Sequence, residues 1–220
     1  MRSLNEYITL NESGEYNLRP NSKDELKKLI DQRIKEQGPN CDLNDIDVSR
    51  VKDMSWLFGN TDFNGDISKW DVSRVEDMSY MFYGAIDFNS DISKWNVSNV
   101  KSMCNMFWYS HFNGDLSKWN VSKVEDMSHM FEYSHFNGDI SKWNVSKVKD
   151  MSYMFYFSRF GGDISKWDVS RVEDMSYMFW HSKVNCNLSK WNVSSSTNME
   201  HMFEASPLKG KEPSWYEMNS

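Results

Sequence analysis

The sequence lacks the cysteine pattern of a disulfide-stabilised or metal-binding protein. Only three cysteines occur in 220 residues, Cys41, Cys104 and Cys186, and no two of them form a CxxC pair. An odd number of widely separated cysteines does not make a disulfide framework. The cysteine content therefore favours a reducing compartment.

Long apolar runs and blocks of like charge are also missing. The residues after Arg2 never make the apolar stretch of about seven that a secretory signal needs, and no stretch has the length of a transmembrane helix. The formal net charge is −7, from 32 acidic and 25 basic residues dispersed along the chain. This charge gives no electrostatic reason to expect nucleic acid. We expect a cytoplasmic protein that binds neither nucleic acid nor membrane, with a surface or virion location as the alternative.

The common catalytic and cofactor-binding motifs are absent as well. The chain contains no HExxH, G-x-S-x-G, P-loop or dinucleotide fingerprint. Its five histidines form no pair with an acid at metal-ligand spacing. We therefore predict that the protein is not an enzyme and has no catalytic residue, cofactor or metal.

What the sequence does contain is one motif that occurs seven times. The interval is 24 residues, except for one step of 25 between Trp70 and Trp95. Repetition on this scale indicates a solenoid in which each copy buries the apolar side chains of its neighbour. When the copies are aligned, one position is tryptophan in six of the seven, and we call it the tryptophan slot. The residues in this position are Ile46, Trp70, Trp95, Trp119, Trp143, Trp167 and Trp191.

Each copy shows two apolar periodicities, as in the fourth copy. Trp119 and Val121 lie two apart and would share one face of a short strand. Val124, Met127 and Met130 then follow the stripe of a short amphipathic helix. Asn-Gly dipeptides in several copies favour a tight turn before the next strand. The predicted fold class is α/β, a leucine-rich-repeat-like solenoid of about seven strand-helix-turn repeats with caps at both ends.

The chain divides into three parts on this interpretation. Ser22 and Glu25 have the spacing of a capping box, and Gly38-Pro39 would end the helix that follows it. The last copy departs from the motif, because Ser196 replaces the usual valine. The predicted parts are 1–40, an N-terminal segment with a capping helix; 41–205, the solenoid; and 206–220, a C-terminal cap or tail.

The repeated string FNGDISKWNVS, followed by V-x-D-M-S-x-M-F, resembles the repeat of the BspA-like leucine-rich-repeat surface proteins. These proteins occur in bacteria, mycoplasmas, some protists and phages, and many have no known function. The resemblance covers residues 41–205. It implies a leucine-rich-repeat-type solenoid and, from characterised relatives, adhesion or protein binding.

The function predicted from these features is a noncatalytic repeat scaffold that binds a protein partner. The alternative is a cell-surface or virion adhesin that recognises a host surface protein or a glycan. A third interpretation is self-association through an uncapped end of the solenoid.

The candidate binding residues are aromatic side chains in slots that vary between copies. On the predicted helix these slots face away from the apolar stripe. Large aromatic side chains in contact with water are typical anchors of interfaces, although the rings could instead pack against one another along the solenoid. The candidates are Trp56, Tyr80, Trp108, Tyr109, Tyr133, Tyr153, Tyr156, Tyr177 and Trp180.

A column of aspartates leaves two interpretations open. Each aspartate precedes a tryptophan slot and follows a turn, so stacked carboxylates could collect calcium. Alternatively, each could accept hydrogen bonds from nearby backbone N–H groups in an Asx-turn. The column consists of Asp66, Asp91, Asp115, Asp139 and Asp163.

Overall fold

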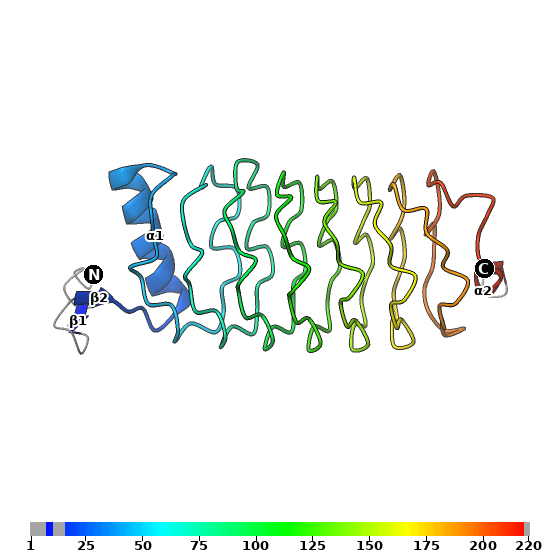
Figure 1. The fold of residues 1–220 in the computed structure, drawn as a ribbon, viewed down its shortest axis with the longest axis horizontal. Coiled ribbons are helices and arrows are strands. Elements are labelled where there is room, and N and C mark those ends of the chain that lie inside the picture. Colours follow the sequence, from blue (N-terminus) through cyan, green and yellow to red (C-terminus); the bar gives the residue numbers. More distant parts are fainter. Residues whose placement is uncertain (1–7, 11–15, 218–220) are drawn as a thin grey trace.

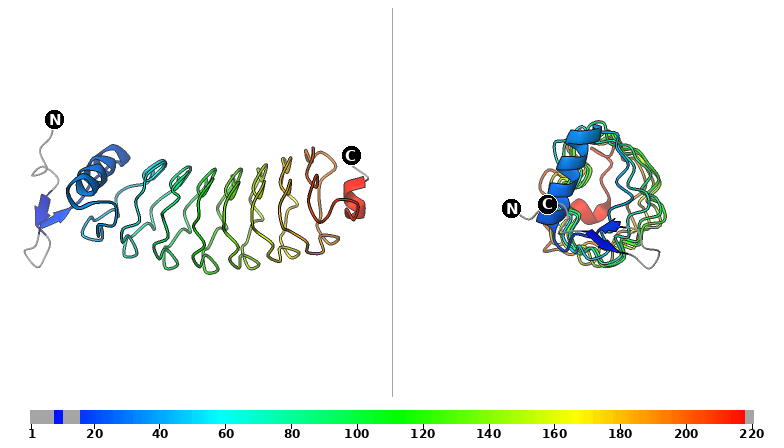
Figure 2. Two further views of the ribbon diagram at one scale, coloured as in Figure 1. Left: turned by 90° about the horizontal axis from the view of Figure 1, so that it is seen from above. Right: turned by 90° about the vertical axis from the view of Figure 1, so that its left-hand side faces the viewer.

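The chain winds into a row of similar coils, and successive copies of the repeat form successive layers of the row (Figure 1). The computed structural model describes residues 8–10 and 16–217. Viewed along the row, the coils superpose into one ring (Figure 2). The architecture is thus a stack of layers, as the 24-residue interval predicts.

Regular secondary structure is confined to the two ends. Strands β1 (Ile8–Leu10) and β2 (Tyr16–Leu18) form an antiparallel pair in which Thr9 faces Asn17. Helix α1 (Lys23–Gln37) lies at the N-terminal end of the stack, and helix α2 (Ser214–Glu217) lies at the other end (Figure 1). Between α1 and α2, consecutive layers share only isolated parallel bridges. One series joins Asp53, Asp77, Ser102, Asp126, Asp150, Asp174 and Asn198.

The predicted helix of each repeat is wrong. In the fourth copy, the backbone N–H groups of His129 and Phe131 donate to carbonyls of the next copy, at 2.9 and 3.0 Å. The N–H of Met130, between them, donates to Met127 three residues back, at 3.2 Å. An α-helix would instead send every N–H four residues back. His129 and Tyr133 also have positive φ angles of 57° and 53°, which close consecutive turns and interrupt a right-handed helix.

The predicted strand of each repeat is wrong for a similar reason. The N–H of Trp119 donates to Leu116 at 3.1 Å, and that of Val124 donates to Val121 at 2.9 Å. These bonds close turns on both sides of the tryptophan slot, so the segment does not extend as a strand. Among the described residues, β1 and β2 are the only strands. The α/β leucine-rich-repeat class is therefore replaced by a stack of coils built mostly from turns.

Short polar side chains form the corners of each coil. In the fourth copy, the Oδ1 atoms of Asp115 and Asp126 each accept from a serine N–H two residues on, at 2.8 and 2.9 Å. Ser134 Oγ accepts from the N–H of Phe136 at 3.2 Å. Such local bonds satisfy the backbone where the chain changes direction. The column from Asp66 to Asp163 makes this bond in every copy, as the Asx-turn interpretation predicts.

The interior of the stack is apolar and continuous. Trp119 is 3% exposed, and Val121, Met127 and Met130 are buried with it. The indole N–H of Trp119 donates to the carbonyl of Ile92 in the preceding copy, at 3.1 Å. The inward positions predicted from the repeat are therefore confirmed, although the backbone that carries them is different.

Helix α1 has the predicted start and end. Ser22 is its N-cap, and Ser22 Oγ accepts from the N–H of Glu25 at 3.3 Å. Gly38, with a φ of 86°, follows its last residue. Leu26 and Ile30 are fully buried and join the apolar core of the first copies.

At the other end, α2 continues the tryptophan column. Trp215 lies 24 residues after Trp191, and the two rings stack with centroids 6.2 Å apart. The indole N–H of Trp215 donates to the carbonyl of Leu188 at 2.9 Å, as the six tryptophans from Trp70 to Trp191 in the aligned position of the repeat do to the copy before them. Trp215 therefore covers the apolar side of the last copy.

Candidate partner-binding surface

In each coil, the turns place the side chains of two recurring positions, which are often aromatic, on the outside of the stack. In the fourth copy, Met130 and Phe131 are fully buried, whereas His129 is half-buried and Tyr133 is 37% exposed. His129 and Tyr133 are the two residues with positive φ. The same pair of slots has positive φ in every copy, so aromatic side chains recur on one surface of the stack. We call this surface the aromatic face.

The first of the two positive-φ positions, the one that holds His129 in the fourth copy, forms a column of rings along the stack. This column is divided into two groups of stacked rings. Trp56 and Tyr80 have centroids 4.5 Å apart and are nearly parallel. Tyr153 stacks between His129 and Tyr177, at 4.7 Å from each. The groups are separated by Asn105, which is buried and donates to Cys104 Sγ at 3.0 Å.

Two neighbouring columns extend the aromatic face. Tyr83 and Trp108 stack at 4.3 Å, and Tyr156 lies 6.3 Å from Trp180. Tyr133 contacts Tyr109 edge to face at 6.4 Å. Phe157 and His181, which the sequence places in the same position of the repeat as Tyr109 and Tyr133, stack at 4.3 Å. Their positions at the same 24-residue spacing are the sequence signal that identifies them.

All nine candidate residues lie on the aromatic face, but with different exposure. Trp56, Tyr109 and Tyr133 are exposed, Trp56 at 45% and Tyr109 at 49%. Rings stack along the axis and also reach solvent, so mutual packing and exposure occur together. The remaining candidates are half-buried: Tyr80, Trp108, Tyr153, Tyr156, Tyr177 and Trp180.

Three tyrosines of this face have phenols whose ionisation is disfavoured. Burial raises the pKa of the phenols of Tyr80, Tyr133 and Tyr153 above the ordinary value. One polar contact interrupts the rings: His129 Nδ1 lies 2.5 Å from Glu132 Oε2. The aromatic face is thus mainly apolar, with phenol hydroxyls as donors.

The three cysteines are free thiols. Cys41 is buried, and Cys104 and Cys186 are half-buried. Burial raises the pKa of each thiol, so the protonated form prevails at neutral pH. Among the described residues, no three side chains of the His, Cys, Asp or Glu type cluster as a metal site would require.

Another surface carries charges that alternate from copy to copy. Glu76 pairs with Lys52 at 3.0 Å and with Lys101 at 2.7 Å, and Glu125 pairs with Lys149 at 2.8 Å. The hydrogen bonds from Lys101 and Lys52 lower the pKa of Glu76 to about 2. We call this series the charge column: Lys52, Glu76, Lys101, Glu125, Lys149 and Glu173.

Within the described ranges, 8–10 and 16–217, no helix has the length and apolarity to span a bilayer.

Comparison with known proteins gives a family and no named relative. No curated protein and no solved structure matches the chain. The family model described as "Mycoplasma protein of unknown function, DUF285" matches residues 26–135 and 109–215. Because these overlapping matches cover most of its length, the chain belongs to the DUF285 family of repeat proteins.

Proposed function

We propose that this protein is a noncatalytic scaffold whose aromatic face binds another protein. The observation that supports this proposal is the set of aromatic side chains in left-handed backbone positions. A non-glycine residue in that region costs about 1–2 kcal/mol. In other copies the same left-handed positions are occupied by Gly84, Asn60 and Asn105. Residues that adopt this conformation at a lower energetic cost than an aromatic residue therefore fit there. Aromatic stacking contributes about 0.5–1.5 kcal/mol, which at most offsets this conformational cost.

The way the rings stack favours a protein over a glycan. Tyr153 has His129 against one face and Tyr177 against the other. A sugar that stacks on an aromatic residue needs a free ring face, and Tyr153 offers only its edge and hydroxyl. Edges, hydroxyls and exposed rings such as Tyr109 suit the mixed apolar and polar contacts of a protein interface.

The adhesin remains the second candidate, because the repeat resembles that of the BspA-like surface proteins. It differs from the scaffold in where the protein acts and in what its partner is. Fractionation of the native host, followed by immunodetection, separates the two: recovery on the cell surface supports the adhesin, and recovery in the cytoplasm supports the scaffold.

The aromatic face is tested by pull-down with mass spectrometry, comparing variants with the wild-type protein. Tyr153→Ser combined with Tyr177→Ser and Trp180→Ser should abolish capture of the partner. Because these rings are half-buried, the exposed pair Tyr133→Ser with Phe157→Ser serves as a second variant that disturbs the fold less. The matched control replaces exposed lysines of the same copies: Lys118→Ser, Lys142→Ser and Lys166→Ser.

We expect both aromatic variants to lose the partner and the lysine variant to keep it. Capture of the same partner by folded aromatic variants would refute the binding role of this face. Loss in the lysine variant alone would move the site to the lysine side of the stack.

A further inference from the structure

A column of polar side chains follows the aromatic face and changes its charge along the stack. In the third copy its member is His111, two residues after Tyr109, and in every copy the member directly precedes a buried apolar residue. The first two members are acidic, the middle two are histidines, and the last two are basic. We call this series the graded column: Asp62, Asp87, His111, His135, Arg159 and Lys183.

The members of the graded column lie in register in successive layers. The phenylalanine rings that directly follow the first three members stack at 6.4 and 5.8 Å. The rings of His111 and His135 stack at 4.0 Å and are nearly parallel. The N–H of Arg159 donates to the carbonyl of Ser134, the residue before His135, at 3.1 Å. Because the coils superpose when viewed along the row (Figure 2), the column runs along one side of the stack.

The charges of the graded column have no partner within their own chain. Asp62, Asp87, Arg159 and Lys183 are all exposed. In the part of the chain that the structure describes, none of these four side chains makes an ion pair or a hydrogen bond. Five steps of about 4.8 Å separate Asp62 from Lys183 by roughly 24 Å. This distance is about three times the screening length of roughly 8 Å at physiological salt, so the two ends do not compensate each other.

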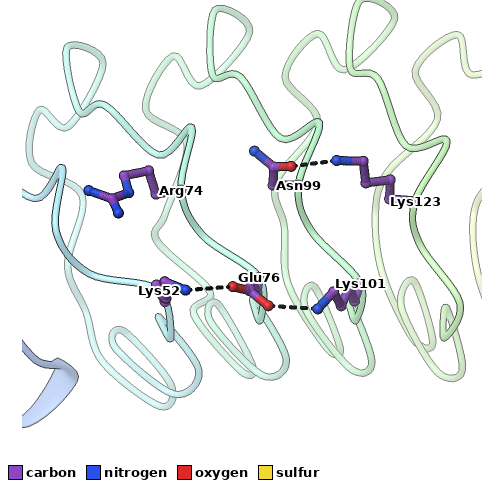
Figure 3. A pocket seen from close by; sticks show the side chains of 6 residues that line it. All are labelled: Lys52, Arg74, Glu76, Asn99, Lys101 and Lys123. Carbon is purple, nitrogen blue, oxygen red and sulfur yellow. Dashed lines mark hydrogen bonds and ion pairs between the residues drawn. The ribbon is translucent and has the colours of Figure 1, made fainter.

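The charge column on another surface shows the contrasting arrangement. There, Glu76 bonds to Lys52 and to Lys101 in the layers on either side of it (Figure 3). Charges that alternate between layers are thus neutralised within one chain, whereas charges sorted to opposite ends are not. The three paired residues line a hollow together with Arg74, Asn99 and Lys123.

The order of the charges is antisymmetric about the middle of the graded column. Consider a second copy of the chain related by a two-fold axis that runs across the stack, between the third and fourth copies of the repeat. The axis reverses the order of the layers, so that each column faces its own reverse. Asp62 then lies opposite Lys183 of the partner subunit, and Asp87 lies opposite Arg159 of the partner subunit. A parallel pair of chains would instead place like charges opposite each other.

The middle of the column does not oppose this arrangement. The axis places His111 opposite His135 of the partner subunit. Burial, with smaller effects of His111 and Arg159, lowers the pKa of His135 below its ordinary value. The ring of His135 is therefore neutral at pH 7 and adds no like charge where the two chains cross.

The second positive-φ column of the aromatic face matches its own reverse in size. The axis places Phe157, which is 41% exposed, opposite Gly84 of the partner subunit. Gly84 has no side chain, and the three atoms nearest to the place of a Cβ there all belong to Asn60. The ring of Tyr109 in the next layer therefore leaves the space beside Gly84 open. Tyr109 itself lies opposite Tyr133 of the partner subunit, so that a large side chain meets the gap and the other exposed rings meet each other.

We propose that the aromatic face and the graded column bind a second copy of this chain in an antiparallel dimer with two-fold symmetry. This inference rests on the proposed function, because it identifies the protein bound by the aromatic face as another molecule of the same chain. The opposite charges at the two ends set the direction of the partner, and the exposed rings supply the apolar contact.

The test reverses the charges at one end of the graded column or at both. Analytical ultracentrifugation over a series of protein concentrations measures the affinity of the dimer at physiological ionic strength. Asp62→Lys with Asp87→Lys places bases opposite bases, and Arg159→Glu with Lys183→Glu places acids opposite acids. We expect each double variant to weaken the dimer by about tenfold or more. Tyr133→Ser with Phe157→Ser should also weaken it, because these rings are exposed in the monomer.

The decisive variant combines the four charge reversals. Its net charge equals that of the wild type, and it restores opposite charges only when the two chains are antiparallel. We expect its affinity to return to within about threefold of the wild-type value, because the reversals at facing positions compensate each other. The matched control Lys118→Glu with Lys142→Glu reverses two exposed charges outside the graded column, and should weaken the dimer much less than either double variant.

Two results would overturn the proposal: a wild-type protein that stays monomeric throughout the series, or a fourfold variant that dimerises as weakly as the double variants. The proposed function fails separately. If the chain is monomeric but the aromatic variants lose a different protein in the pull-down, the aromatic face binds that protein and the dimer alone is wrong. If the chain is monomeric and the folded aromatic variants keep their partner, both are wrong.

Discussion

The indole N–H of Trp143 donates a 3.0 Å hydrogen bond to the carbonyl of Leu116, which belongs to the preceding copy. The same bond recurs in each copy from Trp70 to Trp191, and Trp215 repeats it in α2. The tryptophan thus fills the interior of its own layer and satisfies a buried backbone acceptor of the layer before it.

This double role predicts two different costs. Trp143→Ala should lower the free energy of unfolding by about 3–5 kcal/mol, because it removes a large buried aromatic side chain. Trp143→Phe keeps most of the apolar volume but removes the indole bond, so that the Leu116 carbonyl keeps only the N–H of Trp119 as a donor. The loss of one such hydrogen bond costs about 0.5–1.5 kcal/mol. Urea unfolding followed by circular dichroism measures both. A wild-type midpoint for Trp143→Ala would show that the indole is not buried.

The left-handed turns predict an unusual order of stability at Tyr153, where φ is 56°. Both Tyr153→Gly and Tyr153→Ala lose the ring stack, but only alanine keeps the steric cost of positive φ. The glycine variant should therefore be more stable than the alanine variant by about 1 kcal/mol.

In an α-helix the order would be reversed, because glycine is less favourable than alanine there by about 1 kcal/mol. Thermal unfolding of the two variants therefore distinguishes turns from a helix directly. A more stable alanine variant would contradict the turn conformation.

Trp215 should protect the end of the stack. Trp215→Ala uncovers the ring of Trp191 and removes one of the two donors to the carbonyl of Leu188, the other being the N–H of Trp191. We expect faster amide hydrogen exchange in the last copy, with little change near Trp119, because contacts in a stack run mainly between neighbours. The exposed Lys211→Ala is the control. Equal exchange in both variants would show that α2 does not cover the core.

Glu76 should titrate far below an ordinary glutamate. Its two lysine partners lower its pKa from 4.5 to about 2. Because the folded pKa is the lower one, the ion pairs favour the folded state above pH 4.5, and this contribution is lost as the pH falls through about 2.

The measurement is an NMR titration of the Glu76 carboxyl group. Lys101→Gln removes the partner with the largest effect and should raise this pKa toward the ordinary value. Glu125, whose pKa is lowered mainly by Lys149, serves as an internal reference that the substitution at residue 101 affects less. An unshifted Glu76 in the wild-type protein would mean that the pairs are not formed in solution.

The sequence predicted the position of each copy and the side of the chain that faces inward. Val124, Met127 and Met130 are all buried, because an apolar pattern reports which side chains leave water. The pattern does not report where the backbone N–H groups go. The spacing of these three residues fits a helix, but consecutive turns that bond to the next layer bury the same positions.

Signals of the turns are present in the sequence but are weaker than the apolar period. Asp126 and Ser128, two residues apart, recur in nearly every copy and form an Asx-turn at the place where the helix was predicted. The aromatic candidates lie on one side of the stack because the positions that vary between copies also point outward, and their role in binding stays a prediction. A hollow lined by Arg74, Asn99 and Lys123 depends on one residue that departs from the repeat and on contacts between three layers, which a motif averaged over seven copies does not reveal.

Because the charges of the charge column alternate in sign, losing an odd or an even number of interior copies has different effects on which charges become neighbours. Removing one 24-residue copy, for example the one that contains Glu125, would bring Lys101 and Lys149 into adjacent layers. Removing two consecutive copies would keep opposite charges adjacent. Although the tryptophan column repeats every 24 residues, the smallest segment that can be gained or lost in the interior of the charge column without placing like charges side by side is a pair of copies. With respect to charge, the repeating unit is therefore a pair of copies, and the interior of the stack can change its length most easily by two copies at a time.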